Sequence, residues 1–275
     1  MPDPALPKIS LVTPSYNQAA FLEETLRSVL DQGYPRLEYL VMDGGSTDGS
    51  VEVIRRHEAG IAHWQSQPDA GQSEALAQGF ARSSGEVLGW LNSDDTLEPG
   101  ALLAVGEAFA RHPEVDLVYG NLNFVDAAGR TLFTAYPLLR LGILRYENRF
   151  VPQQSMFWRR PLYERVGGVN PSLRFAMDYE LLLKFLLAGA TTRKIDRVLG
   201  SFRVHADAKS STIRDVMRRE WGEILSRFLP DAPGPLGQRL RAAAWRAYRF
   251  LREPRSVLCA VRSRTCGVDR AILFG

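Results

Sequence analysis

The feature that most constrains the fold is a regular alternation of short apolar runs with amphipathic helical patterns over the first 120 residues. Each run has the length and composition of a buried strand, and the apolar residues that follow it recur at helical spacing. This alternation predicts an α/β domain with a mostly parallel sheet and helices on both faces. The predicted strands are Ile9–Thr13, Leu37–Met42, Val87–Leu91 and Val115–Tyr119, and the helical patterns begin near Leu22, Val51, Leu76 and Ala101.

The pattern changes after Gly120. Residues 121–134 contain two β-rich runs around the turn Asp126-Ala127-Ala128-Gly129, which predicts a hairpin. Three prolines and two glycines in Pro230–Gly237 predict a linker. The remaining predicted elements are a strand at Gln154–Arg159, an apolar helix at Tyr179–Leu187 and a last pair of strands within Lys194–Val204.

Charge is distributed unevenly along the chain. Hydrophobic residues make up 45% and charged residues 24%, as in an ordinary globular protein. From Arg214 onward, however, the chain has thirteen arginines and six acidic residues, so this tail has a charge of +7. Because the whole chain has a net charge of +3, residues 1–213 together have a charge of −4. We therefore predict two parts, an α/β domain over 1–212 and a basic helical C-terminal extension over 213–275.

The extension holds an amphipathic pattern with a basic border. A helix of this kind can lie on an anionic membrane surface. It can also pack on the domain with its arginines solvated, and both interpretations stay open, whereas nucleic-acid binding is disfavoured. The apolar stripe consists of Leu236, Leu240, Ala243, Ala244, Ala247, Phe250 and Leu251, and the arginines beside it are Arg239, Arg241, Arg246, Arg249 and Arg252.

Targeting signals and cysteine spacing bear on the compartment. Residues 1–10 contain no apolar run behind a basic flank, and no later stretch is long enough to span a bilayer. We therefore expect a cytoplasmic protein, peripheral at the inner face of the membrane if the tail binds lipid. Cys259 and Cys266 lie far from the histidines, which fits neither a disulfide framework nor a zinc site and predicts free thiols.

Polar loops follow three of the predicted strands. The first strand ends in Thr13-Pro14-Ser15-Tyr16-Asn17, the second in Asp43-Gly44-Gly45-Ser46-Thr47-Asp48-Gly49 and the third in Asn92-Ser93-Asp94-Asp95. In an open parallel sheet the carboxyl ends of the strands share one edge, and ligands bind there. The sequence therefore predicts a binding site at that edge.

Two common nucleotide sites are excluded. The first strand is not followed by G-x-G-x-x-G, and G-x-x-x-x-G-K-[ST] is missing from the sequence. Asp94 and Asp95 instead place carboxylates directly after a buried strand. Such hard oxygen ligands suit Mg²⁺ or Mn²⁺, and an acidic loop needs a cation of this kind to bind a diphosphate.

Five motifs in this order resemble the family 2 glycosyltransferases, which have the GT-A fold and use nucleotide sugars. The resemblance runs from about Ile9 to about Ser211, and the order of the motifs makes it specific. It implies a nucleotide diphosphate sugar as donor and a sugar or lipid-linked acceptor. The motifs are Ile9 to Asn17, Asp43-Gly44-Gly45-Ser46-Thr47-Asp48, Pro68-Asp69-Ala70-Gly71-Gln72-Ser73, Asn92-Ser93-Asp94-Asp95 and Met177-Asp178-Tyr179-Glu180-Leu181.

The resemblance also assigns roles to the residues that bind the donor and the metal. Asn92-Ser93-Asp94 stands where the family has its D-x-D motif, which makes Asp94 the principal metal ligand because the Asn92 amide is a weaker one. Asp95 is a second candidate ligand, and His205 is a third or else an ordinary histidine. The residues implied for the nucleotide sugar are Thr13, Pro14, Ser15, Tyr16 and Asp43 at the base and ribose, Asp69, Gly71 and Gln72 closing over the nucleotide, and Asn92, Ser93 and Asp94.

Asp178 matches the aspartate of the family's E-D motif, its catalytic base, although Met177 replaces the preceding glutamate. As the base it would take the proton of the acceptor hydroxyl while that oxygen attacks the anomeric carbon opposite the leaving nucleotide, which inverts the configuration. A helix N-terminus would stabilise the carboxylate, and a role as helix cap is the structural alternative.

Other residues are weaker candidates. Lys209 could contact the diphosphate or be an ordinary solvated lysine. Gln153 and Gln154 are expected to face the acceptor pocket. Asn17 is expected to cap the first helix.

Two further functions compete with glycosyl transfer. A non-catalytic nucleotide-sugar binding protein is favoured by Asn92 and Met177. It is disfavoured by the retained Asp94, Asp95 and Asp178. A sugar nucleotidyltransferase would need a glycine-rich basic loop after the first strand, where this chain has Pro14-Ser15-Tyr16-Asn17.

Overall fold

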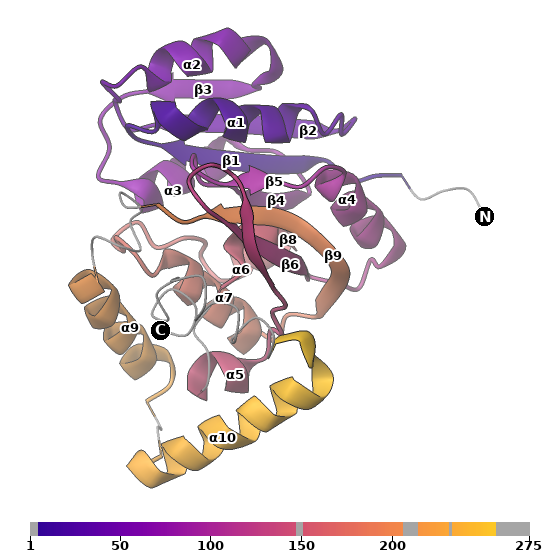
Figure 1. Ribbon diagram of the computed structural model, residues 1–275, viewed down its shortest axis with the longest axis vertical. Helices are drawn as coiled ribbons and strands as arrows, with labels where there is room; N and C mark the ends of the chain where they lie inside the picture. Colours follow the sequence, from indigo (N-terminus) through magenta and orange to yellow (C-terminus); the bar gives the residue numbers. More distant parts are fainter. Residues whose placement is uncertain (1–4, 147–150, 206–213, 231–232, 257–275) are drawn as a thin grey trace.

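The computed structural model describes residues 5–146, 151–205, 214–230 and 233–256 (Figure 1). Within them the strands form one sheet in the order β3-β2-β1-β4-β8-β6-β9-β5, and β7 pairs with β6 beside this path. The strands are β1 (Ile9–Ser15), β2 (Leu37–Asp43), β3 (His63–Ser66), β4 (Val87–Trp90), β5 (Thr96–Leu97), β6 (Leu117–Val125), β7 (Thr131–Ala135), β8 (Met156–Arg159) and β9 (Thr192–Arg203).

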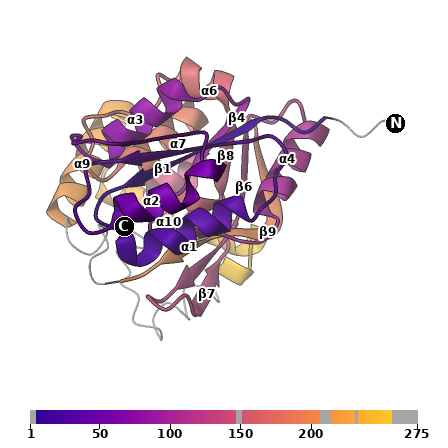
Figure 2. The ribbon, with the colours of Figure 1, turned by 90° about the horizontal axis from the view of Figure 1, so that it is seen from above.

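The sheet has a parallel half and a mixed half. β3, β2, β1 and β4 are parallel neighbours, and β6 and β9 are parallel as well. β8 pairs antiparallel with both β4 and β6, and β5 pairs antiparallel with β9. The predicted hairpin is confirmed as β6 and β7, which Figure 2 shows extending away from helices α3 and α6.

Helices cover both faces of the sheet because neighbouring strand residues point to opposite sides. Leu11 packs in one hydrophobic core with residues of α1 (Ala19–Leu30), α2 (Ser50–His57) and α4 (Ala101–Arg111). Val12 packs in the other core with residues of α3 (Gln72–Arg82), α6 (Arg160–Arg165) and α7 (Met177–Leu187). The predicted α/β fold with a mostly parallel sheet is therefore confirmed.

Two local predictions are corrected, and strand β3 is not among the predicted elements because its four residues carry too short a pattern. The strand predicted from Gln154 begins at Met156, since Gln153–Ser155 form the short helix η2. The strand pair predicted within Lys194–Val204 is one strand, β9. Its pairing with β6 passes from Lys194 directly to Val198, so the intervening residues bulge without ending the strand.

Helix α9 (Arg214–Phe228) shares the core of the α/β domain. Ile224 and Leu229 are 3% and 8% exposed in the same core as α3 and α7, and Trp221 packs edge-on against Tyr179. The division into 1–212 and 213–275 stays a prediction. The predicted linker is shorter than expected, because Pro235 begins helix α10 (Pro235–Arg252).

Helix α10 packs on α5 (Leu141–Tyr146) through one face and leaves the other open. A Cβ at Gly142 would overlap the Trp245 ring, so the two helices meet closely there. Just after α10, Glu253 Oε2 lies 2.6 Å from Lys194 Nζ of β9. The apolar stripe points outward, with Leu236, Leu240, Phe250 and Leu251 exposed by 72, 64, 51 and 78%. No helix in the described part of the chain has the length and apolarity needed to cross a membrane.

Candidate active site

The loop after β2 is organised around the carboxylate of Asp43, which is 1% exposed. Its Oδ2 accepts hydrogen bonds from the N–H groups of Gly45 and Ser46, at 3.1 and 2.9 Å. The same oxygen accepts from Ser66 Oγ at 2.7 Å, while Oδ1 accepts from Ser46 Oγ at 2.5 Å. Oδ2 therefore holds the loop against β3 while Oδ1 fixes Ser46 within the loop, and a contact of Asp43 with a nucleotide stays a prediction.

The residues that end β1 differ in their exposure. Thr13 is fully buried, and its hydroxyl lies 2.9 Å from Tyr39 Oη. Pro14 and Ser15 are also buried, whereas Tyr16 is 62% exposed. Tyr16 is thus the side chain of this segment that is open to a ligand, and Thr13 and Pro14 support it from inside the sheet.

The loops after β1 and β2 interlock. Asn17 has a φ of 51°, and its Oδ1 accepts from Thr47 N at 2.9 Å. The first turn of α1 is capped from the second loop, because Ala19 N donates to Asp48 Oδ2 at 2.9 Å and Gln18 N donates to Ser50 Oγ at 3.0 Å. The expectation that Asn17 caps this helix is therefore wrong, since its amide is used to join the two loops.

The segment before α3 brings a third loop to the same edge. The Asp69 carboxylate lies against Gly44, where a Cβ would come within 3.1 Å of both its oxygens. Asp69 Oδ1 accepts from Gly71 N at 2.8 Å, and Gly71 has a φ of 120°, which favours glycine. Gln72 Nε2 donates to Asn92 Oδ1 at 2.7 Å. These contacts link the loops after β2, β3 and β4; the sequence predicted this edge for the loops after β2 and β4, and the loop after β3 was not part of that prediction.

Asp95 lies beneath the acidic loop and is 1% exposed. Its Oδ2 accepts from Gln154 Nε2 at 2.7 Å and from Asn92 Nδ2 at 3.0 Å, and its Oδ1 accepts from Arg203 N at 2.9 Å. Burial raises the pKa of Asp95 well above its usual range, and the neighbouring Asp94 raises it further. This geometry favours a role in positioning the loop, and direct metal ligation by Asp95 stays a prediction.

Gln153 and Gln154 are 3% and 4% exposed and turn toward the interior. Gln153 donates to the carbonyl oxygen of Trp90, and Gln154 to Asp95. The expectation that they face an acceptor pocket is therefore wrong. Because η2 places both amides under β4, they support the acidic loop from below.

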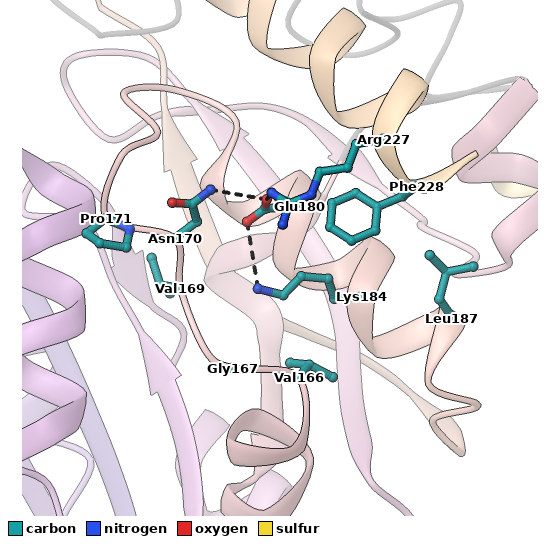
Figure 3. Close-up of a pocket in the computed structure, with 10 residues that line it drawn as sticks. All are labelled: Val166, Gly167, Val169, Asn170, Pro171, Glu180, Lys184, Leu187, Arg227 and Phe228. Atoms are coloured by element: carbon teal, nitrogen blue, oxygen red, sulfur yellow. Dashed lines mark hydrogen bonds and ion pairs between the residues drawn. The ribbon is translucent and has the colours of Figure 1, made fainter. Parts of the chain in front are cut away.

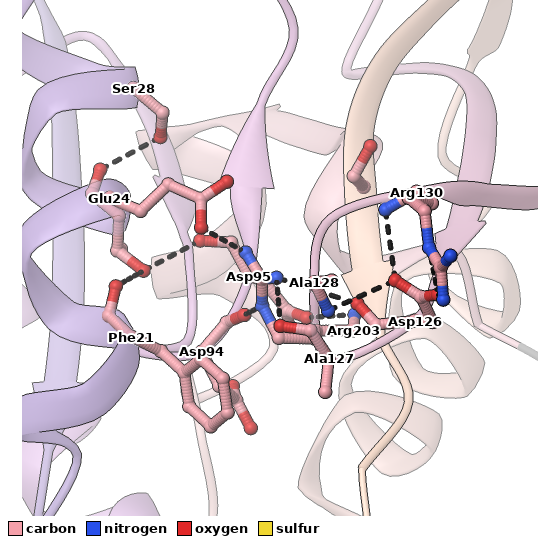
Figure 4. A network of polar contacts seen from close by, with 12 residues as sticks. Phe21, Glu24, Ser28, Asp94, Asp95, Asp126, Ala127, Ala128, Arg130 and Arg203 are labelled. Atoms are coloured by element: carbon pink, nitrogen blue, oxygen red, sulfur yellow. Dashed lines mark hydrogen bonds and ion pairs between the residues drawn. The ribbon is translucent and has the colours of Figure 1, made fainter.

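Arg203 is a central residue that sequence reasoning missed (Figure 4). It is 2% exposed, and its Nε donates to the carbonyl oxygen of Asp94 at 2.9 Å. Nη2 pairs with Glu24 of α1 at 2.6 Å, and Nη1 donates to the carbonyl oxygen of Ala127 at 3.1 Å. One guanidinium thus joins the acidic loop, α1 and the β6–β7 turn. The sequence signal that could have indicated a buried, paired arginine is its position between Phe202 and Val204 in a predicted strand.

Asp94 and His205 lie together at the surface of this network. His205 Nε2 is 3.1 Å from Asp94 Oδ2, and Phe21 holds the imidazole with a ring-to-ring distance of 4.7 Å. His205 Nδ1 is buried and has no hydrogen-bond partner among the described residues. The histidine side chain is 5% exposed and the aspartate 20%.

These two side chains fit a divalent cation. Two adjacent ligands of an octahedral ion, each at about 2.1 Å, lie about 3 Å apart, close to the observed separation. Asp94 and His205 could therefore both bind one ion with little movement. The described residues contain no group of three or more His, Cys, Asp or Glu side chains arranged for a metal, so the remaining ligands would be donor oxygens and water.

Asp178 occupies the second position of α7, after the buried Met177. Its Oδ1 accepts from Tyr179 N at 2.6 Å. The residue at the N-cap is Ala176, which offers no side-chain cap. Glu220 of α9 supplies one instead, because its carboxylate accepts from the N–H groups of Arg174, Phe175 and Ala176 at 2.7, 2.9 and 2.9 Å.

The segment that leads to Asp178 is tied to the first turn of α3. Ser73 Oγ, in the first turn of α3, donates to the carbonyl oxygen of Leu173. This bond ties the segment before α7 to the first turn of α3, and a position of Asp178 beside the strand-end loops stays a prediction. Lys209, Cys259 and Cys266 lie outside the described residues.

Relatives of this chain include proteins named as glycosyltransferases. An uncharacterised glycosyltransferase of Mycobacterium tuberculosis is 32% identical over 66% of this chain and 70% of its own length. The O-antigen biosynthesis protein RfbC of Myxococcus xanthus is 31% identical over 74% of this chain, which spans only 16% of that protein. The chondroitin synthase of Escherichia coli is 23% identical over 82% of this chain and 33% of its own length.

Solved structures share the fold. A mannosyltransferase of Pyrobaculum calidifontis, in complex with GDP-Man and Mn²⁺, has a TM-score of 0.64 at 19% identity, covering 97% of this chain and 82% of its own. TarS of S. aureus, residues 1–349 with UDP-GlcNAc, has a TM-score of 0.61 at 19% identity, covering 88% of this chain and 72% of its own. Residues 10–167, more than half of the chain, match glycosyl transferase family 2. On these grounds the chain belongs to glycosyl transferase family 2.

Proposed function

We propose that this glycosyltransferase moves a sugar from a nucleotide diphosphate donor to an acceptor hydroxyl with inversion, in the synthesis of a cell-surface polysaccharide or glycolipid. The observation that carries the proposal is the pair Asp94 and His205, whose side chains lie 3.1 Å apart in the loop that follows β4 and at the end of β9. The relatives named for O-antigen biosynthesis and chondroitin synthesis support a polysaccharide product.

The donor would lie across the strand-end loops. Tyr16 is 62% exposed and would stack on the base. Asp69 and Gly71, which precede α3, and Gln72 at its first position would close over the nucleotide. The solved relatives named with GDP-Man and UDP-GlcNAc support a nucleotide sugar without selecting the base.

Asp94 and His205 would hold Mg²⁺ or Mn²⁺ against the diphosphate. Such an ion, when bound, neutralises the charge that develops on the departing nucleoside diphosphate. The solved mannosyltransferase named with Mn²⁺ supports this assignment.

Asp178 would act as the base. It is partly exposed at the N-terminus of α7, where the helix dipole favours the ionised carboxylate. Its oxygen would accept the proton of the acceptor hydroxyl while the acceptor oxygen attacks the anomeric carbon.

The outward stripe of α10 supports a further part of the proposal, a cytoplasmic enzyme held at the inner face of the membrane. Leu236, Leu240 and Leu251 are open to lipid, and the arginines of the same helix suit anionic headgroups. An acceptor linked to lipid would then be presented at the surface where the enzyme lies.

The experiment is a panel of nucleotide sugars incubated with the protein in Mn²⁺, in Mg²⁺ and in EDTA, with release of nucleoside diphosphate as the readout. We expect release from a small subset of donors, and only with metal. Binding of a donor without release, with every acceptor tried, would favour the alternative of a non-catalytic nucleotide-sugar binding protein.

A further inference from the structure

The side-chain amide of Asn92 lies between groups from two different elements. Its Oδ1 accepts a hydrogen bond from Gln72 Nε2 at 2.7 Å, and its Nδ2 donates to Asp95 Oδ2 at 3.0 Å. Gln72 is the first residue of α3, whereas Asn92 and Asp95 belong to the loop that follows β4. The acceptor end and the donor end of the amide are therefore both used inside the protein, and they join α3 to the loop that carries Asp94.

The Asp95 carboxylate explains why position 92 needs a donor. This carboxylate also accepts from Gln154 Nε2 at 2.7 Å and from Arg203 N at 2.9 Å, so it is the acceptor in each of its three hydrogen bonds with described residues. Asp95 is 1% exposed, and charges interact strongly where water is excluded. A carboxylate at position 92 has no N–H to donate. It would place a second negative charge against Asp95 at the 3.0 Å that separates the present groups.

The place of the Asp94 side chain depends on this contact. Asp94 lies between Asn92 and Asp95 in the chain, and its Oδ2 is 3.1 Å from His205 Nε2. Helix α1 adds a contact to the end of the same loop, because the Thr25 hydroxyl donates to the carbonyl oxygen of Asp95 at 2.8 Å. The Asn92 amide fixes the beginning of the loop. A displacement of about 1 Å can lower activity strongly, so this amide affects how Asp94 and His205 are presented to a cation.

We propose that Asn92 is a positioning residue, whose amide holds the loop of Asp94 against α3 and must be an amide because Asp95 is its partner. The proposal rests on the proposed function, since this loop is the one assigned to the cation and the diphosphate. It differs from the interpretation of Asn92 as a weak metal ligand. A carboxylate at position 92 would improve a metal ligand, whereas it would disrupt the contact with Asp95.

The test exchanges the two groups in the full-length protein, with calorimetry of UDP, GDP, ADP, CDP and dTDP in saturating Mn²⁺ as the measurement. Asn92→Asp and Asp95→Asn should each weaken nucleotide binding by about tenfold or more, because each leaves two acceptors or two donors facing each other. The double variant should recover to within about threefold of wild type, because its carboxylate at position 92 accepts from its amide at position 95 and the net charge is unchanged. Gln154 can follow by turning its amide, which has a donor end and an acceptor end.

Asn170→Asp is the matched control, because Figure 3 shows the same kind of contact outside the strand-end loops. Asn170 Nδ2 donates to Glu180 Oε1 at 3.2 Å, and Glu180 is 2% exposed. The Oδ1 of Asn170 accepts from Ser172 Oγ at 2.7 Å, so this amide also uses both of its ends. The variant should leave nucleotide binding unchanged, since the segment between α6 and α7 contains no residue assigned to the donor.

The outcomes separate the positioning proposal from the proposed function. The positioning proposal alone is overturned if wild type binds a nucleotide and Asn92→Asp binds it equally well or better, or if the double variant binds no better than the single variants. It is also overturned if Asn170→Asp loses as much affinity as Asn92→Asp, because a general loss of stability would then be sufficient. Wild type that binds none of the nucleotides in Mn²⁺ would overturn the proposed function, and the positioning proposal with it.

Discussion

The Glu220 carboxylate accepts a hydrogen bond from Ala176 N at 2.9 Å and so caps the helix whose second residue is Asp178. Glu220 is 5% exposed and belongs to α9, beyond the residues 10–167 that match the family. The C-terminal part of the chain therefore holds the N-terminus of α7, on which the proposed base lies.

Glu220→Gln tests whether this contact serves the reaction. The amide keeps one acceptor oxygen but cannot accept all three N–H donors, so Asp178 should be held less firmly, and kcat should fall about tenfold with little change in KM for the donor. Glu223→Gln, one turn of helix from Glu220 and exposed, should leave both quantities unchanged. A wild-type kcat in Glu220→Gln would restrict this residue to a role in stability.

Asp178→Asn separates an enzyme from a binding protein. The amide preserves shape but cannot take a proton at neutral pH, so transfer should fall by roughly 10²-fold or more while the donor dissociation constant is unchanged. Both are measured with one donor, transfer by product formation and binding by calorimetry. Should this variant transfer at the wild-type rate, the base lies elsewhere.

Asp94→Asn should produce a different phenotype, because it weakens the hold on a cation instead of removing a proton acceptor. We expect donor binding to weaken by about tenfold or more, and His205→Ala to have the same effect with smaller amplitude. EDTA should reproduce both results in wild type, and excess Mn²⁺ should partly rescue the variants. Donor affinity that is insensitive to EDTA would remove the metal assignment.

The double variant Leu240→Glu with Leu251→Glu tests the membrane surface. Both leucines are exposed, so the fold should be retained while binding to vesicles with anionic lipid falls at least tenfold at low salt. Leu103→Glu, at an exposed leucine of α4, is the control. Equal sedimentation of all three proteins with vesicles would show that α10 does not dock.

Glu38 should make stability depend on pH. Burial alone would raise its pKa, but hydrogen bonds from Lys8, Ser10 and Ser84 outweigh this and lower the pKa from 4.5 to about 2. Because the folded-state pKa is depressed, this stabilisation is fully present above pH 4.5 and is lost as the pH falls toward 2. Urea unfolding should therefore find Glu38→Gln less stable than wild type at pH 7, with the difference shrinking below pH 4.5. A difference independent of pH would contradict the assignment.

Much of the fold follows from local pattern. Leu11 and Val12 pack in different cores because adjacent strand residues point to opposite faces, a periodicity visible in the sequence. Asp69, Gly71 and Asn92 follow strand ends, and the topology of a parallel sheet brings such loops to one edge. The apolar stripe of α10, on which the proposed membrane contact rests, was likewise predicted from the helical spacing of its apolar residues alone.

The tertiary structure decided what each polar residue contacts. Asp94 and Asp95 are adjacent in sequence, yet one lies beside His205 near the surface and the other is buried among Gln154, Asn92 and Arg203. Arg203 pairs with Glu24 from 179 positions away, and Glu220 caps Ala176 from 44 positions away. Periodicity depends on neighbours along the chain and can be read from it. The partner of a buried charge depends on which distant segments pack together, so only the folded chain determines it.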